Sequence, residues 1–403
     1  MNNSPKLASF NKIFTGLFAL AVPFSFLNIA ELNMPKINQD NLPSRKIVVF
    51  EEGTTVAQRD VILGSLNDKR IKRMEKAGDI DVLENISNLD VSKLLKSDKV
   101  KTVEEDAIAT TQARNVTIQA QTLPWGIDRI DAELVWPGGN NANTVKVGVI
   151  DTGISSSHPD LQANIKGGIN TIRPFRGWND DNGHGSHVAG IIGALNNTSG
   201  VVGAAPQVDL YAIKVLNSAG SGYISDIIEG LDWAIANKMQ IVNMSLGCNC
   251  PSVALSDAVK KVNQAGIVQV AAAGNSGSAV IYPAAYPEVI AVSATDSSNN
   301  IASFSSRGPE VDISAPGVSI LSTYKGNNYA TLSGTSMASP HVAGAAALLL
   351  NNPVDDSYDA DNDGKWDPSE VLSKLQSTAT DLGVTGMDDL YGAGLLNANL
   401  ASQ

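Results

Sequence analysis

From about residue 145 onward, the chain alternates short apolar runs with longer stretches of helical periodicity. The apolar runs are rich in valine and isoleucine, and several show no polar alternation, which is typical of strands covered on both faces. They occupy residues 145–151, 208–216, 241–246, 266–274 and 289–294. Helical periodicity is clearest over 224–239 and 252–266. Strands that alternate with helices predict an α/β fold with a doubly wound, mostly parallel sheet.

The pattern before residue 120 is different. Residues 46–50 predict a strand, 54–66 and 90–97 predict amphipathic helices, and 99–109 form a charged, strand-like segment. Residues 110–122 are polar and carry no apolar periodicity, which indicates a linker. A small α+β domain followed by an exposed linker is the arrangement of a removable pro-segment, here assigned to 45–119. An ordinary N-terminal domain is the alternative.

The first 30 residues have the pattern of an export signal. Lys6 and Lys12 precede an apolar run over 13–30 that Pro23 interrupts. This run is short for a membrane span but suits the apolar region of a signal peptide, so residues 1–30 are assigned to one. A buried core helix is the alternative. We therefore expect secretion, to the medium or to a periplasm, with no membrane anchor in the mature form.

The net charge of residues 120–403 limits the kinds of partner that this part of the chain can bind. Residues 1–119 carry 16 basic and 15 acidic residues, whereas residues 120–403 carry 13 and 26. This acidity argues against a nucleic-acid or anionic-membrane partner. The only cysteines, Cys248 and Cys250, are separated by one residue, and the sequence leaves free thiols and a strained disulfide both open.

Polar residues with catalytic potential lie at the ends of the predicted strands and helices. Asp151 ends the first strand, Asn275 follows another, and His184 opens a helix of small residues. Glycines on both sides of His184 are expected to give its imidazole room to reach a substrate. Ser336 opens a helix that runs to about Leu350, where partial positive charge and free N–H groups stabilise an oxyanion. Each residue alone has an ordinary structural explanation as a cap or turn, but together they favour nucleophilic catalysis.

The segments around these residues resemble the motifs of a known protein family. DTG, HGSHVAG, AAAGN and GTSMASPHVAG resemble the motifs of the subtilisin-like serine proteases, in the same order, with Ser186 where threonine is usual. The similarity covers residues 120–403, the predicted catalytic domain, and residues 45–119 resemble the family's pro-segments. The resemblance implies that Asp151 orients His184, that His184 is the general base and acid, and that Ser336 attacks the substrate carbonyl. It also implies that Asn275 donates to the oxyanion.

The same resemblance implies a cleft for an extended polypeptide substrate, formed by two edges. One edge is Gly220, Ser221 and Gly222, and the other is Ser245, Leu246 and Gly247. Strand addition of this kind gives affinity through main-chain hydrogen bonds. The loop after Asn275 is uncharged, so we expect an apolar or broad preference before the scissile bond. Cys248 replaces the commoner glycine beside the pocket wall.

Two Ca²⁺ sites are expected, one of them from the resemblance. Its implied ligands are Gln121, Asp160, Leu195, Asn197, Ser199 and Val201, with carbonyl oxygens from Leu195, Ser199 and Val201. An oxygen-only ligand set suits a hard cation.

The second site follows from the sequence alone. Residues 359–370, DADNDGKWDPSE, match the D-x-D-x-D-G-x₅-E calcium loop at every position, within an insertion at 355–370. The expected ligands are Asp359, Asp361, Asp363, the Lys365 carbonyl, Asp367 and Glu370. An acidic surface loop is the alternative.

Taken together, the sequence predicts a secreted, monomeric serine endopeptidase made as an autoprocessed zymogen that its own pro-segment inhibits. A lipase or esterase would show Gly-x-Ser-x-Gly and the order Ser, Asp, His, and neither is present. A non-catalytic relative would have lost a triad residue, and a calcium-binding module explains only residues 355–370. The pro-segment cut is placed at Gln112–Ala113 by family spacing or at Gln119–Ala120 by the mature start; both remain open, as does the natural substrate.

Overall fold

A computed structural model describes residues 44–110, 115–116 and 120–403. The expected signal peptide and both candidate cut positions therefore fall wholly or partly outside the described residues. The elements before residue 120 are β1 (Arg45–Phe50), α1 (Val56–Leu63), β2 (Arg70–Met74), β3 (Ile80–Glu84), α2 (Asn88–Leu94), β4 (Val100–Glu105), β5 (Ile108–Thr110) and β6 (Asn115–Val116).

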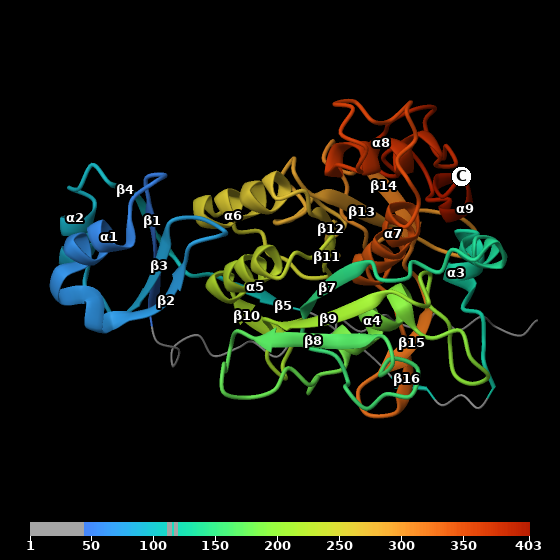
Figure 1. Ribbon diagram of the computed structural model, residues 1–403, viewed down its shortest axis with the longest axis horizontal. Coiled ribbons are helices and arrows are strands. Elements are labelled where there is room, and N and C mark those ends of the chain that lie inside the picture. The colour runs from blue at the N-terminus through green and yellow to red at the C-terminus, as the bar shows by residue number, and fades with distance from the viewer. Residues whose placement is uncertain (1–43, 111–114, 117–119) are drawn as a thin grey trace, which may run out of the picture. The chain divides into compact units, whose positions relative to one another are not determined.

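The remaining elements form the larger part of the fold (Figure 1). The strands are β7 (Lys146–Asp151), β8 (Ile165–Asn170), β9 (Asp209–Lys214), β10 (Ser221–Tyr223), β11 (Ile241–Met244), β12 (Val268–Ala272), β13 (Ile290–Thr295), β14 (Ile313–Pro316), β15 (Ile320–Tyr324) and β16 (Asn328–Leu332). The helices are α3 (Trp125–Arg129), α4 (His184–Gly193), α5 (Ile224–Ala236), α6 (Val253–Gln264), α7 (Thr335–Leu350), α8 (Pro368–Ser377) and α9 (Ala398–Ala401).

A seven-stranded parallel sheet organises this larger part. Its order is β14-β13-β12-β11-β7-β9-β8, and the paired strands run parallel throughout. The chain moves from β7 to one side of the sheet, returns, and continues from β11 on the other side. Ligand sites in such sheets lie beyond the carboxyl ends of the strands where the direction changes, which here are the ends of β7 and β11.

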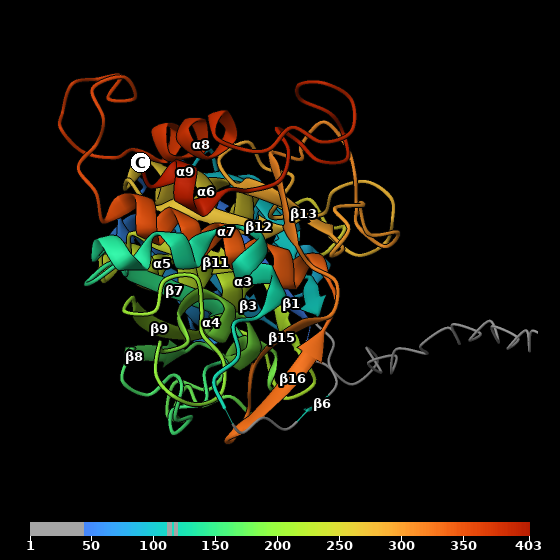
Figure 2. The same cartoon turned by 90° about the vertical axis from the view of Figure 1, so that its right-hand side faces the viewer.

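Helices cover both faces of this sheet, as Figures 1 and 2 show. One apolar core includes residues of α4, α7, α8 and α9 (Val188, Val342, Val371, Ala398), and the other includes residues of α5 and α6 (Ile227, Leu255). All strand residues of β11, β12 and β13 are buried. This two-sided burial explains their continuous apolar sequence and confirms the predicted fold class.

The N-terminal part is a small antiparallel α+β unit. Its four strands are ordered β2-β3-β1-β4, with α1 and α2 against them. Thr55 and Ser87 cap the two helices through reciprocal bonds with Gln58 and Asp90. The predicted strand and helices are present, whereas β2 and β3 were not anticipated.

Three further elements lacked a clear sequence pattern. β8 contains Gly167 and Gly168, which disfavour strands, yet a Cβ at Gly168 would lie 2.1 Å from the carbonyl oxygen of Ala212 in β9. Close approach of the two strands therefore requires glycine there. β15 and β16 form a hairpin around Gly326, whose φ is +68°.

Candidate active site

Asp151 and His184 form a buried pair at the carboxyl end of β7. The His184 Nδ1 atom lies 2.9 Å from both Asp151 carboxylate oxygens, and the two side chains are 0 and 1 % exposed. The backbone N–H of Thr152 donates to Asp151 Oδ1 at 2.7 Å. This arrangement fixes a protonated Nδ1 and leaves Nε2 to exchange a proton with another group.

The other three histidines serve the structure. His187 Nε2 lies within hydrogen-bond distance of the Ile320 and Ala330 carbonyl oxygens, and burial lowers its pKa to about 3. Burial also lowers the pKa of His341 to about 4 and that of His158 below its usual value. Burial therefore disfavours the charged form of these three imidazoles, whereas His184 is paired with the Asp151 carboxylate.

The glycines beside His184 do not provide the open space that the sequence suggested. A Cβ at Gly183, whose φ is +117°, would lie 2.2 Å from the Tyr324 ring. A Cβ at Gly185 would lie 2.2 Å from the Gly153 carbonyl oxygen. These glycines are needed because the His184 turn packs tightly against its neighbours, so that expectation was wrong.

Ser336 lies in the first turn of α7, a 16-residue helix that packs against α4 and the sheet. Its hydroxyl donates to the Ser245 carbonyl oxygen at 3.1 Å, and the Ser245 hydroxyl donates back to the Ser336 carbonyl at 2.8 Å. The end of β11 therefore holds the serine turn in place. In this state the Ser336 hydroxyl is hydrogen-bonded to the Ser245 carbonyl oxygen and not to His184.

Two donors converge beside Ser336. Asn275 Oδ1 accepts hydrogen bonds from the Thr335 N–H at 2.8 Å and the Thr335 hydroxyl at 3.0 Å, which leaves its N–H₂ group facing away. A Cβ at Gly334 would lie 3.4 Å from Asn275 Nδ2 and 3.7 Å from Ser336 N. Asn275 Nδ2 and Ser336 N therefore both lie near Gly334.

A strand of the N-terminal part occupies the first edge of the predicted cleft. β5 pairs antiparallel with β10, with Thr110 opposite Ser221 and Ala109 opposite Gly222. Gly220 precedes this strand in a turn closed by its N–H bond to the Asn217 carbonyl. The edge therefore accepts an extended chain by strand addition.

The second predicted edge lies beside Ser336. Ser245 is bonded to Ser336, Leu246 is buried, and a Cβ at Gly247 would lie 2.6 Å from the Tyr282 carbonyl oxygen. Cys248 and Tyr282 then exchange two backbone hydrogen bonds of 3.0 Å. The segment 245–248 is thus a rigid wall.

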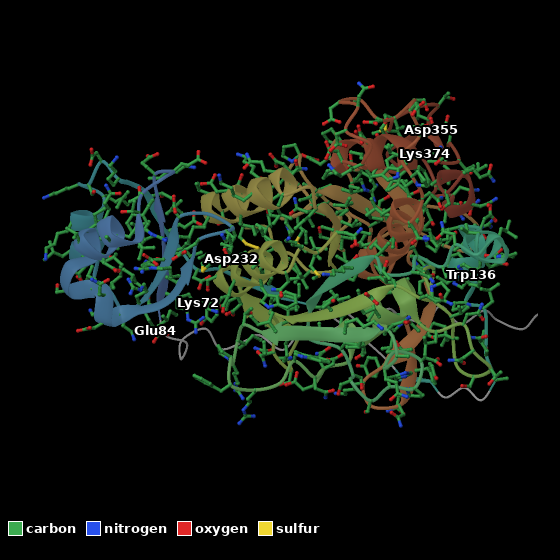
Figure 3. The ribbon with its side chains drawn as sticks, viewed as in Figure 1. Lys72, Glu84, Trp136, Asp232, Asp355 and Lys374 are labelled. Carbon is green, nitrogen blue, oxygen red and sulfur yellow. A yellow bond between two sulfur atoms is a disulfide. The ribbon has the colours of Figure 1, made fainter. Side chains whose placement is uncertain are left out.

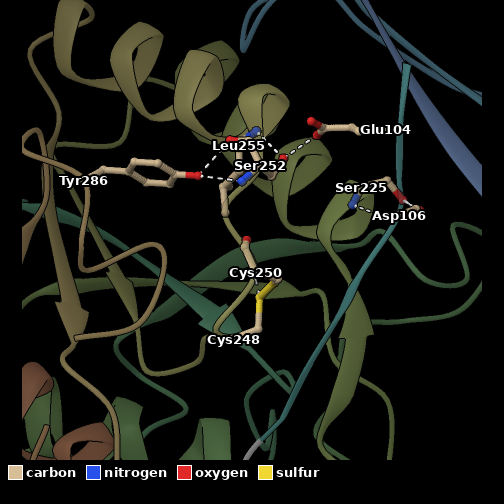
Figure 4. The surroundings of a disulfide bond; sticks show 8 residues. All are labelled: Glu104, Asp106, Ser225, Cys248, Cys250, Ser252, Leu255 and Tyr286. Atoms are coloured by element: carbon tan, nitrogen blue, oxygen red, sulfur yellow. Dashed lines mark hydrogen bonds between the residues drawn. A yellow bond between two sulfur atoms is a disulfide. The ribbon is translucent and has the colours of Figure 1, made fainter. Parts of the chain in front are cut away.

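Cys248 and Cys250 form a disulfide in this wall, with their Cα atoms 5.2 Å apart (Figure 4). The sequence left free thiols and a disulfide both open, and the structure has the disulfide.

Two carboxylates near β5 cap two helices of the larger part (Figure 4). Glu104 accepts from the Val253 and Ala254 N–H groups at 3.0 and 3.2 Å, and from the Ser252 hydroxyl, at the start of α6. Asp106 accepts from the Ser225 N–H at 2.8 Å and from its hydroxyl, at the start of α5. Through these hydrogen bonds both side chains join the N-terminal part to helix starts of the larger part. Sequence analysis missed these roles, although the acidic run 104–106 was visible.

Further contacts join α5 to the N-terminal part. Lys72 lies 3.0 Å from the Asp226 carboxylate and also pairs with Glu229. Asp232 Oδ1 accepts from the backbone N–H groups of residues 75–77, and Figure 3 shows Lys72 and Asp232 where the two parts meet.

The residues of the first expected Ca²⁺ site lie together. Asp160 is fully buried, and its carboxylate accepts from neutral donors: Asn197 Nδ2, the Val201 N–H and the Tyr329 hydroxyl, each at 2.9 Å. Gln121 Nε2 donates to the Leu195 carbonyl at 3.0 Å, and the Ser199 N–H donates to Asn197 Oδ1 at 2.7 Å. Burial, followed by the hydrogen bond to Asp160, raises the pKa of Tyr329 above its usual value.

The calcium-type loop is assembled only in part. Asp359, Asp361 and Asp363 each place a carboxylate oxygen within 4.8 Å of the others, on an exposed surface. Glu370 is 5 % exposed and accepts from the Ala360 N–H at 2.7 Å and the Asp367 N–H at 3.0 Å. Asp367 is the N-cap of α8, and the Lys365 ammonium lies 2.8 Å from Asp363.

Comparison with known proteins identifies the family of the chain. Residues 142–394 match the model of the subtilase family. The chain belongs to the subtilase family.

Several relatives support this assignment. An alkaline protease of Alkalihalobacillus alcalophilus is 44 % identical over 357 residues, which cover 88 % of each chain. Subtilisin E of Bacillus subtilis (strain 168) is 42 % identical over 400 residues, 96 % of this chain and 97 % of the relative. Subtilisin DY of Bacillus licheniformis is 51 % identical over 289 residues, which cover 70 % of this chain and all of the relative.

The difference in coverage is informative. Subtilisin E matches almost the full length, including the N-terminal part, which corresponds to a subtilisin propeptide. The chain is thus a subtilisin-like secreted serine endopeptidase made as a zymogen, as the sequence predicted. Within the described residues, no helix has both the length and the hydropathy to span a membrane.

Proposed function

We propose that Asp151, His184 and Ser336 form the catalytic triad of this subtilase and that Asn275 completes its oxyanion hole. The observation that carries the proposal is the buried Asp151–His184 pair, together with an Asn275 side chain that is hydrogen-bonded to Thr335, the residue just before Ser336. A peptide carbonyl in the space beside Gly334 would meet two donors and the nucleophile together.

The chemistry follows from these positions. Ser336 Oγ attacks the carbonyl carbon while His184 Nε2 takes the hydroxyl proton, and the carbonyl π electrons move to oxygen. Asp151 stabilises the imidazolium, and Ser336 N and Asn275 Nδ2 stabilise the oxyanion. His184 then protonates the leaving amine, and water hydrolyses the acyl-enzyme by the same sequence of proton transfers. Digestion of casein, with mass spectrometry of the new termini, tests this activity.

The substrate is an extended polypeptide held between Gly220–Gly222 and Ser245–Gly247. Support comes from β5, which already occupies the first edge in antiparallel register. The loop 276–287 carries no charged side chain, so the preference before the scissile bond is apolar or broad. The enzyme acts as a monomer, released to the medium or a periplasm after removal of residues 1–30.

The propeptide, assigned to 45–119, acts as an inhibitor that autoprocessing releases from the catalytic domain at 120–403. Glu104 and Asp106 support this role because they cap two helices of the catalytic domain. The strand β5 blocks the edge at which substrates bind.

Binding of the isolated propeptide is expected to weaken as pH rises from 5 to 7. Burial, with a smaller effect of Asp226, raises the pKa of Asp106 to about 6 in the complex, against about 4 when the carboxyl is exposed in free propeptide. The complex therefore binds a proton more tightly than its separated parts. This contribution is fully present below pH 4 and is lost as pH rises through 6. The dissociation constant should rise by about tenfold between pH 5 and 7.

Titration calorimetry with the Ser336→Ala enzyme measures the dissociation constant of the propeptide, because this variant cannot cleave it. Asp106→Asn keeps an acceptor for the α5 cap but removes the titrating group, so most of the pH dependence should disappear. Burial also raises the pKa of Glu229, which pairs with Lys72 of the N-terminal part, so a smaller pH dependence should remain in this variant. Equal affinities of the wild-type propeptide at both pH values would contradict the assignment.

Two Ca²⁺ sites are proposed, at Gln121, Asp160, Leu195, Asn197, Ser199 and Val201, and at Asp359, Asp361, Asp363, Lys365, Asp367 and Glu370. The first is supported by the buried Asp160, whose carboxylate accepts hydrogen bonds from three neutral groups, since a buried carboxylate favours a cationic partner. The second is supported by three clustered carboxylates with Glu370 folded beneath the loop. Ca²⁺ at either site would balance charge and fix a loop.

Chelation is expected to lower the thermal stability of the mature enzyme. At Ca²⁺ 100-fold above Kd, each site contributes about 2.7 kcal/mol to the free energy of unfolding. Calcium titration should give two equivalents for the wild type and one each for Asp160→Asn and Asp359→Asn. Unchanged stoichiometry in either variant would remove that site from the account.

A further inference from the structure

Asp180 is a buried carboxylate, 4 % exposed, in the loop before α4. Its Oδ1 accepts hydrogen bonds from Thr152 Oγ1, the Asn182 N–H and the Gly183 N–H, at 2.9, 2.9 and 2.8 Å. Its Oδ2 accepts from the Ser186 N–H at 2.9 Å and the Ser186 hydroxyl at 2.6 Å. One side chain thus organises the whole turn that carries His184.

These bonds also reach the strand that carries Asp151. Thr152 follows Asp151, and its hydroxyl both donates to Asp180 and accepts from the Gly185 N–H at 2.9 Å. The Thr152 hydroxyl therefore bridges the end of β7 and the first turn of α4. Because Asp180 is the acceptor for that hydroxyl, it sets the direction in which the hydroxyl can receive Gly185.

The backbone of Thr152 is also held by Lys214, a residue of β9. Lys214, which is 4 % exposed, donates to the Thr152 carbonyl at 2.6 Å and to the Leu216 carbonyl at 2.8 Å. Lys214 is also the register partner of Asp151 in the sheet. With its carbonyl held by Lys214, Thr152 has one adjustable polar atom left, its hydroxyl, and Asp180 holds that atom.

We propose that Asp180 is a positioning residue that sets the geometry of the Asp151–His184 pair. The proposal rests on the triad assigned above, and Asp180 itself acts through Thr152 and the His184 turn. Displacement of a catalytic group by about 1 Å can cost about 10²-fold in rate. Loss of the carboxylate should therefore reduce turnover more than substrate binding.

Asp180→Asn tests the proposal most directly. The amide keeps one acceptor oxygen, but its N–H₂ group replaces the oxygen that accepts from the Ser186 N–H. Two donors then face each other, and this hydrogen bond is lost. We expect kcat on a peptide p-nitroanilide to fall 10- to 100-fold, with KM changed less than about threefold. Thr152→Val removes the bridging hydroxyl without altering Asp180, and we expect a loss of similar size. It keeps the proposal testable if Asp180→Asn does not fold.

Combining Asp180→Asn with Asp151→Ala distinguishes a positioning role of Asp180 from a general loss of structure. In Asp151→Ala, the orientation of His184 is already lost, so adding Asp180→Asn should lower the residual kcat by less than about threefold. Asp312→Asn is a matched control, since the Asp312 carboxylate also accepts a backbone N–H, from Ala291 at 2.8 Å. Its kcat per folded enzyme should be unchanged even if its Tm falls.

Two results would overturn the proposal: unchanged kcat in Asp180→Asn, or a full additional loss in the Asp151→Ala background. Failure of the triad itself would appear differently, as activity retained in Ser336→Ala.

Discussion

Ser336→Ala is expected to abolish both proteolysis and removal of the propeptide. The substitution removes the hydroxyl at the start of α7 while leaving the helix, the Asn275 amide and the Asp151–His184 pair in place. Without a nucleophile no acyl-enzyme forms, so turnover should fall by several orders of magnitude. Intact mass and N-terminal sequencing of the secreted protein should show the propeptide still attached.

A control distinguishes loss of chemistry from loss of structure. Ser333→Ala alters an exposed serine three residues earlier, whose hydroxyl accepts from the Ser319 N–H at 2.8 Å. It should process and cleave normally. The same N-terminal cut in wild type and Ser336→Ala would show that another protease removes the propeptide.

Asn275→Ala is expected to reduce kcat by about 10²- to 10³-fold, the value known for one oxyanion donor in this protease family. Asn275 Nδ2 lies near Gly334, and in the proposed oxyanion hole it meets a negative charge that develops only in the transition state. KM should therefore change little, because the ground-state carbonyl gains less from this donor.

Steady-state rates on a peptide p-nitroanilide measure the split between kcat and KM. Asn237→Ala is a suitable control, because Asn237 is exposed at the end of α5 and donates to the Trp233 carbonyl. An equal loss in both variants, or a loss confined to KM, would contradict the oxyanion assignment of Asn275.

The places of the proposed catalytic residues in the fold could be predicted because they depend on topology. Asp151 ends a buried strand, and His184 and Ser336 begin helices, so an alternating α/β pattern brings them to one edge of the sheet. Asn275 follows β12 at the same edge. The apolar sequences of β7, β9, β11, β12 and β13 predicted the strands of the sheet and therefore the edge at which these residues lie.

Other features depend on contacts that no local pattern encodes. The role of Gly183 is set by Tyr324, and that of Asp180 by Thr152, both distant in sequence. The caps formed by Glu104 and Asp106 join the N-terminal part to the larger part across more than a hundred residues of sequence. Strand β8 exists because β9 lies beside it, although its own glycines disfavour it.

The most direct test of the account is covalent labelling of the mature enzyme with a serine-directed sulfonyl fluoride, followed by peptide mapping. We predict one adduct, on Ser336, and labelling slowed by orders of magnitude in His184→Ala, because the imidazole removes the hydroxyl proton. An adduct on another residue, or equally fast labelling without His184, would contradict the triad.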